Sequence, residues 1–280
     1  MVQDYLTLGW TVRLPLLQTH APCALAATTL TSVLGAARTL HSYVYVDFAS
    51  GSGGPTPYIE RHVNRQLESR GEEPVAFVMT DISPHVAAWE GAVKKSGSGF
   101  LGFVAEGVDA TRAPAREVLL RGVPGGDRVG KAGKKGREKR VMRLFSLAFH
   151  HFDDELAVRV LRDTMERGDA FCIFELQSRN LASLFMVSLL WPLAMLLAPI
   201  YFWRRPAHLF FTYLVPLVPF VWVFDGLVSC LRTRTVEEIE ALMVQAVGEE
   251  GLRGWKVRSG EEVHTVGIGK LYWSVVTKED

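Results

Sequence analysis

The stretch Tyr43-Val-Tyr-Val-Asp-Phe-Ala-Ser-Gly-Ser-Gly-Gly-Pro55 is the most informative in the chain. Its first part, residues 43–48, is a short apolar run typical of a strand buried in a parallel sheet. Its second part is rich in glycine, which lets the backbone approach a ligand without a Cβ in the way. A helix is expected from Thr56 to about Arg70, with a proline near its start. The stretch therefore predicts a strand, a tight turn and the N-terminus of a helix.

Strands and helices continue to alternate after this unit. Further strands are expected at 75–80, 100–105, 141–149 and 170–176, and helices at 84–95, 113–121 and 153–167. Such alternation predicts an α/β fold with a parallel sheet wound on both faces and ligands at the carboxyl ends of its strands. The chain closes with a helix over 235–247, which has capping-box spacing at its start, and with strands at 255–258 and 271–277. The uncharged residues 21–37 are expected to form a helix against the domain.

Three carboxylates stand at the ends of the first three strands. Asp47 ends the first, Asp81 follows the second and Asp109 follows the third. A carboxylate after the second strand of such a sheet is placed to accept the hydroxyl groups of a ribose. One after the third strand could accept an adenine amino group. The pattern points to a nucleotide-like cofactor.

The turn resembles that of class I S-adenosylmethionine-dependent methyltransferases, which carry an acidic residue followed by alternating glycines. The chain has Asp47-x-Ala49-x-Gly51-x-Gly53, with alanine in place of the first glycine. The similarity covers about 43–177 and 235–277. It implies a doubly wound, seven-stranded, Rossmann-like sheet and S-adenosyl-L-methionine as cofactor.

The resemblance also implies roles for the residues of the motif. The turn from Asp47 to Gly53, including Ser50 and Gly51, would hold the methionine part of the cofactor. Asp81 would hold its ribose and Asp109 its adenine.

Two segments offer candidates for chemistry. His150 and His151 end the fourth strand, where an imidazole could take a proton from the methyl acceptor. The alternative is a structural pair. Asp225, Ser229 and Arg232 follow the apolar insertion and could contact a substrate. Asp225 could equally mark where the chain returns to water. No third ligand has metal-site spacing to the histidines, so no metal is expected.

An apolar hairpin occupies roughly residues 181–224. The run 184–203 contains no charge and is long enough to cross the ~30 Å core of a bilayer, whereas 209–224 is short for a span. Arg204 and Arg205 in the turn and prolines in both arms favour a shallow or re-entrant hairpin over two full spans. A soluble lid over the site is the alternative. The basic segment 128–140 could be a solvated loop or could bind anionic lipid.

Composition excludes several classes of protein. Lys plus Arg total 31 and Asp plus Glu total 30, so no nucleic-acid partner is indicated. The three cysteines, Cys23, Cys172 and Cys230, lie far apart and predict a reducing, cytosolic compartment rather than a disulfide framework. No obligate protein partner is evident.

The predicted organisation is a cofactor-binding part with an N-terminal helix (1–180), a membrane hairpin (181–224) and the rest of the domain (225–280). The predicted function is methyl transfer from S-adenosyl-L-methionine to a lipophilic small molecule reached from the lipid membrane. The alternatives are a non-methylating isomerase or cyclase on the same fold, and a membrane-bound interaction protein with a vestigial pocket.

Overall fold

A seven-stranded sheet with the order β3-β2-β1-β4-β5-β7-β6 forms the centre of the computed structural model, which describes residues 1–123 and 139–279. Its strands are β1 (Tyr43–Phe48), β2 (Phe77–Thr80), β3 (Leu101–Phe103), β4 (Arg140–Ser146), β5 (Ala170–Glu175), β6 (Trp255–Thr265) and β7 (Gly269–Lys278). β1 to β5 run parallel, whereas β7 is antiparallel to both of its neighbours. The order confirms the predicted doubly wound, methyltransferase-like sheet.

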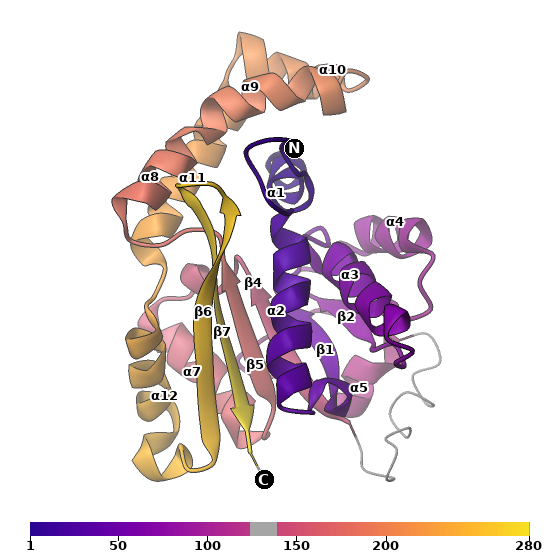
Figure 1. Cartoon of the computed structure of the whole chain (residues 1–280), viewed down its shortest axis with the longest axis vertical. Helices are drawn as coiled ribbons and strands as arrows, with labels where there is room; N and C mark the ends of the chain where they lie inside the picture. The colour runs from indigo at the N-terminus through magenta and orange to yellow at the C-terminus, as the bar shows by residue number, and fades with distance from the viewer. Residues whose placement is uncertain (124–138, 280) are drawn as a thin grey trace.

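Helices cover both faces of the sheet (Figure 1). One face carries α2 (Pro22–Ala36), α3 (Thr56–Ser69) and α4 (Val86–Ser96); the other carries α5 (Arg116–Arg121), α7 (Asp154–Glu166) and α12 (Val236–Gly251). Because side chains alternate along a strand, Tyr43 and Tyr45 join the α2 core while Val44 and Val46 join the α7 core. The continuous apolar run in β1 is thus explained by burial on both faces.

Several strands differ from the predicted bounds: β2 and β3 are shorter than expected, and β4, β6 and β7 differ as follows. β4 ends at Ser146 rather than at 149, because Leu147 adopts a left-handed backbone (φ +52°) and Phe149–His151 form a 3₁₀ turn. β6 and β7 are longer than predicted. β6 is the edge strand of the sheet, where it pairs with β7 and, at its last residue, bridges to Gln18. Most of its side chains are exposed, so its sequence carries little of the apolar pattern of a buried strand.

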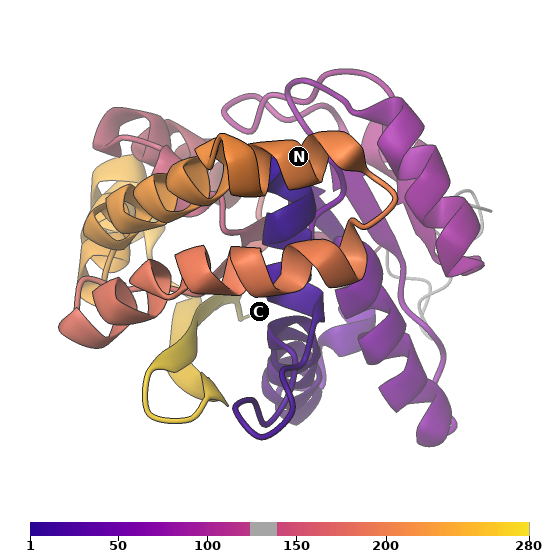
Figure 2. The ribbon, with the colours of Figure 1, turned by 90° about the horizontal axis from the view of Figure 1, so that it is seen from above.

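The apolar insertion is a hairpin of several helices above the carboxyl edge of the sheet (Figure 1). It consists of α8 (Leu181–Ser188), α9 (Leu190–Tyr201), α10 (Pro206–Leu209), the π-helical turn η3 (Phe210–Leu214) and α11 (Leu217–Arg232). Seen from above, its two arms lie side by side across the domain (Figure 2). α11 continues past residue 224, where the insertion was predicted to end, so the candidate residues Asp225, Ser229 and Arg232 belong to a hairpin helix.

The inner side of the hairpin rests on α1 (Val2–Thr11). The Tyr5 ring lies 4.8 Å from Phe202 and 5.4 Å from Trp222, centroid to centroid. The Tyr5 hydroxyl is hydrogen-bonded to Thr212 Oγ1 at 2.8 Å, and Asp4 Oδ2 lies 2.9 Å from His208 Nε2. α1 therefore joins the hairpin to the rest of the domain.

The outer side of the hairpin exposes large apolar side chains. More than half of the surface is open to solvent at Phe185, Ile200, Trp203, Leu214, Phe220 and Phe224. By length and composition, Leu181–Tyr201 could cross a membrane, and the return arm could do so only as a pair of helices bent by 72°. The predicted basic loop, 128–140, lies mostly outside the described residues.

Candidate active site

The glycine-rich turn packs against the end of β2. The Ser50 amide donates to the Thr80 carbonyl at 3.0 Å, and the Trp89 indole donates to the Gly51 carbonyl at 2.9 Å. Gly51 and Gly53 have φ values of +52° and +109°, which favour glycine. These contacts hold the turn in one conformation at the carboxyl edge of the sheet.

Ala49 stands in the same turn with φ +68°. The left-handed backbone conformation costs an L-residue about 1–2 kcal/mol relative to the right-handed conformation. The resemblance expects glycine at this position, and the backbone explains why. The alanine takes up the left-handed conformation nonetheless, so the departure from the motif leaves the path of the turn intact.

Asp47 is buried beneath the turn, at 1% exposure. Its Oδ2 accepts the Thr56 hydroxyl at the start of α3, whereas its Oδ1 has no hydrogen-bond partner among the described residues. Burial raises the pKa of Asp47 to about 7, although the hydrogen bonds from Thr56 and Ser50 oppose that rise. A buried oxygen without a partner is costly, and a donor group of a ligand would satisfy it.

Asp81 joins the end of β2 to the glycine turn. Its Oδ2 accepts the Gly51 amide at 2.8 Å and its Oδ1 accepts the Ser83 amide at 2.9 Å. The side chain is half-buried. Each oxygen of a carboxylate can accept more than one hydrogen bond, so both remain able to accept from a ligand.

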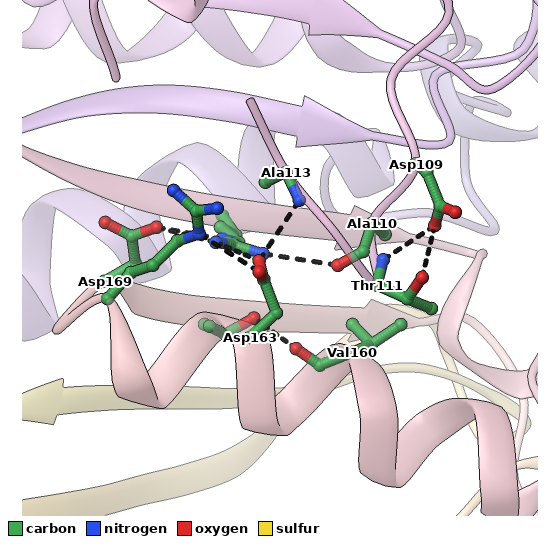
Figure 3. Close-up of polar contacts among 10 residues, drawn as sticks. Asp109, Ala110, Thr111, Ala113, Val160, Asp163 and Asp169 are labelled. Atoms are coloured by element: carbon green, nitrogen blue, oxygen red, sulfur yellow. Dashed lines mark hydrogen bonds and ion pairs between the residues drawn. The ribbon is translucent and has the colours of Figure 1, made fainter. Parts of the chain in front are cut away.

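Asp109 is exposed, and its carboxylate faces a nearby threonine (Figure 3). Oδ1 accepts from the Thr111 amide at 2.8 Å and from the Thr111 hydroxyl at 2.7 Å. The backbone still runs close to Asp81, whose carbonyl accepts the Val108 amide at 2.8 Å. The structure thus brings Asp47, Ser50, Gly51 and Asp81 together directly, and Asp109 only through its backbone.

A buried ion-pair cluster fixes the loop that carries Asp109 (Figure 3). Arg143, fully buried on β4, lies 2.8 Å from Asp163 and 2.9 Å from Asp169. It also donates to the Ala110 carbonyl, and the Ala113 amide donates to Asp163. Sequence reasoning missed this cluster because the three charges are far apart along the chain.

His150 is the centre of a second group of residues at the same sheet edge. Its Nδ1 lies 2.8 Å from Glu175 Oε2, and its Nε2 lies 3.0 Å from Ser229 Oγ. All three side chains are buried. Burial is the largest single effect on the pKa of His150 and would lower it. The charge and hydrogen bond of Glu175, together with the charge of Asp225, outweigh burial, so the pKa is raised.

His151 is placed differently. Its ring is next to that of His150, at 4.2 Å between centroids, and partial desolvation together with His150 lowers its pKa. Arg232 donates to the carbonyls of His150 and His151, at 2.8 and 2.9 Å. Arg232 therefore fixes the backbone of the pair, while Ser229 contacts the ring of His150.

Sequence reasoning missed Glu175 and Gln177. Glu175 is the last residue of β5, and Gln177 Nε2 lies 3.3 Å from its Oε2. The available signal was a charged residue at the carboxyl end of an otherwise apolar strand. It could have been noticed because carboxyl ends are where parallel sheets bind ligands.

A cavity of about 450 Å³ opens beside this group. His150, His151, Gln177, Asp225 and Ser229 form its polar end, and α1, α8, α9 and α11 supply mostly apolar walls. We call it the acceptor cavity. A second cavity, of about 350 Å³, lies beside Gly53 and Gly54, and Leu8 of α1 borders both.

No group of three or more potential metal ligands occurs within residues 1–123 and 139–279. The candidate residues for binding and chemistry thus form two groups. One is the glycine turn with Asp47 and Asp81. The other is His150 with Glu175, Ser229 and the acceptor cavity.

No protein-family model and no curated protein matches the sequence. Solved structures with a similar fold include the pyocyanin biosynthetic protein PhzM, at 15% identity and a TM-score of 0.45 over 91% of this chain and 55% of that one. Magnesium protoporphyrin IX methyltransferase from Synechocystis PCC 6803, with bound S-adenosylhomocysteine, aligns at 13% identity and a TM-score of 0.42 over 90% and 82%.

Human N-acetylserotonin methyltransferase, in complex with S-adenosylmethionine, aligns at 12% identity and a TM-score of 0.40 over 92% of this chain and 56% of that one. The chain spans little more than half the length of PhzM and of the human enzyme. At this level the likeness concerns the fold, and the function rests on the site itself.

Proposed function

We propose that the protein transfers a methyl group from S-adenosyl-L-methionine to a lipophilic small molecule in the acceptor cavity. The observation that carries the proposal is the buried line Glu175–His150–Ser229, which ends at an apolar cavity. This cavity shares Leu8 as a border with the cavity beside the glycine turn. A base oriented by a carboxylate and placed at such a cavity suits removal of a proton from a bound acceptor.

The residues around the turn fit the cofactor. Asp47 Oδ1 is a buried acceptor without a partner in the described chain, which suits the ammonium group of the methionine part. The backbone of Ser50, Gly51 and Gly53 would surround that part, Asp81 would accept the ribose hydroxyls, and Asp109 would be the partner of the adenine. When bound, the cofactor would supply an electrophilic methyl group.

His150 would act as the general base. The carboxylate of Glu175 holds Nδ1, so the lone pair of Nε2 points toward Ser229 and the polar end of the cavity. The acceptor would replace the Ser229 hydroxyl at Nε2 or pass its proton through it. His151 is a second candidate for this role, but no carboxylate orients its ring in the part of the chain that the structure describes.

We further propose that the hairpin lies in the surface of a membrane and that the acceptor enters from there. The exposed apolar side chains of the outer side support this, because soluble monomers rarely expose so large a continuous apolar patch. The contacts of Asp4 and Tyr5 with the return arm support a shallow position over two spans, since spanning would break them. The domain would then face a reducing, cytosolic compartment.

The test of the proposed function is cofactor binding followed by transfer. Asp81→Ala should weaken S-adenosylmethionine binding by roughly 1.5–3 kcal/mol, or about 10- to 100-fold, because the ribose hydroxyls lose a charged acceptor. Isothermal titration calorimetry of the full chain in non-ionic detergent measures this. Asp81→Asn keeps the side-chain size and separates loss of charge from loss of the turn.

The matched control is Glu90→Ala, which removes an exposed carboxylate from the nearby helix α4. Equal affinity in the Asp81 variants and the parent protein would refute the assignment of Asp81. Transfer of a tritiated methyl group to a membrane extract tests the reaction itself. Cofactor binding without any transfer would favour an isomerase or cyclase, and no binding would favour an interaction protein.

A further inference from the structure

The acceptor cavity contains one carboxylate that has no hydrogen-bond or ion-pair partner among the described residues, although its charge helps to raise the pKa of His150. Asp225 lies at its polar end, half-buried, and makes no hydrogen bond or ion pair within the described chain. Arg232, on the same helix, is engaged by the carbonyls of His150 and His151. The Asp225 carboxylate therefore faces a largely apolar space without a partner.

The other ionisable groups of the cavity do not balance this charge. No lysine or arginine occurs among the described residues that line it. Burial lowers the pKa of His264 to about 4, so this ring is neutral, and the pKa of His151 is lowered as well. His150 is paired with Glu175. An anionic head group would thus meet the Asp225 carboxylate and no lysine or arginine among the described lining residues.

The inner face of α11 adds an aromatic ring beside this carboxylate. Trp222, Asp225 and Ser229 all line the cavity, and their spacing of three and four residues places them along one side of a helix. A carboxylate and an indole together suit an ammonium group, which pairs with the first and is attracted to the face of the second. The remaining walls, from Leu6 to Ile268, are mostly aliphatic.

We infer that the acceptor is a lipophilic amine, bound with its nitrogen between Asp225 and His150 and its apolar body along α8 and α9. That the amine is the methyl acceptor rests on the proposed function, whereas its binding in the cavity does not. In the reaction, His150 takes a proton from the ammonium, the freed nitrogen lone pair forms the new N–C bond, and the S–C bond breaks with its electrons going to sulfur. Asp225 balances the charge of the ammonium on arrival.

The experiment compares three probes that share one decyl chain: decylamine, decanol and decanoic acid. Binding of each to the full chain is measured at neutral pH in non-ionic detergent, below the micelle concentration of the probe. We expect the amine to bind at least ~10-fold more tightly than the acid, as a charge-assisted contact provides. Asp225→Asn, which keeps the side-chain size, should weaken the binding of decylamine about tenfold. The affinity for decanol should stay within about threefold of that of the parent protein.

The matched control is Glu240→Gln, an exposed carboxylate on α12. It should leave all three affinities unchanged. The inference is overturned if the acid binds as well as the amine, or if Asp225→Asn leaves the order unchanged. Equal weakening of all three probes would assign Asp225 a structural role and overturn it too.

Cofactor titration of the same variant separates the two proposals. Asp225→Asn should bind S-adenosylmethionine like the parent. If the amine preference holds but no cofactor binds, only the proposed function fails. If the cofactor binds and methyl groups are transferred while the amine preference is absent, only the choice of acceptor fails.

Discussion

His150 is held by a carboxylate on one ring nitrogen and faces a hydroxyl on the other. Replacing it with alanine should lower the rate of methyl transfer by about 10²- to 10⁴-fold, because the acceptor loses its base, while cofactor affinity stays unchanged. His151→Ala is the matched control and should cost far less, since its ring has no orienting carboxylate within the described residues. Single-turnover rates with labelled cofactor measure both. If the single-turnover rate of His150→Ala falls by less than about threefold, the two histidines have a structural role.

The pH dependence of the rate follows from the same contact. The pKa of His150 is raised above its ordinary value, because the charge and hydrogen bond of Glu175 and the charge of Asp225 together outweigh the effect of burial. A base must be neutral, so the rate should rise with pH through that raised pKa and then level off. Glu175→Gln removes the charge and should move the rise to lower pH, with a lower plateau. If the profile of kcat/KM against pH of Glu175→Gln does not shift along the pH axis, Glu175 does not set the pKa of the base.

Single residues also show where sequence reasoning ends. Asp47 and Asp81 could be found because each follows a strand whose end the pattern predicts. Glu175 belongs to the same class of position, yet its partner His150 lies 25 residues earlier and Ser229 lies 54 residues later. A pairing of that kind depends on strand neighbours in the sheet, and only the fold provides it.

The hairpin is the element with the clearest measurable consequence. Replacing the outer residues Ile200, Trp203 and Phe220 with serine should move the protein from the membrane fraction to the soluble fraction, because each loses apolar surface that lipid would cover. The sheet should survive, since the hairpin contributes no strand to it in the described chain. Fractionation at high salt and at alkaline pH measures the change.

The control is a pair of exposed apolar residues elsewhere, Ile82 and Val244, also changed to serine. That variant should remain with the membrane. If the unmodified protein already washes off at high salt and alkaline pH, the hairpin is a packed lid and the membrane proposal is wrong.

Elements were predictable to different degrees. β1 has the predicted bounds because it is apolar on both faces, and α12 begins with the predicted capping box of Thr235 and Glu238. The hairpin was expected as two apolar arms, but the π-helical turn η3 and the bend before α11 were not. The prolines indicated that the helices of the hairpin would be interrupted. The side chains that contact the interrupted region, Asp4 and Tyr5, lie on α1.

At the scale of the whole molecule, the order of the sheet was predictable and the enclosure of the site was not. Alternation of strands and helices, together with the resemblance, is enough to place the ligand at the carboxyl edge. The acceptor cavity, however, has walls from residues as distant as Leu6 and Ile268. Local pattern cannot show that these two ends of the chain meet.

If the hairpin lies in a bilayer, as proposed, the position of α1 would make that bilayer an effector of the chemistry. Leu8 of α1 borders both cavities, and Asp4 and Tyr5 tie that same helix to the hairpin. Insertion of the hairpin then favours one position of α1, and thermodynamic linkage is reciprocal. Vesicles should tighten cofactor binding by some factor, and S-adenosylhomocysteine should raise partitioning onto vesicles by the same factor. Asp4→Ala should reduce both effects together; a change in one without the other would mean that surface and site are not coupled through α1.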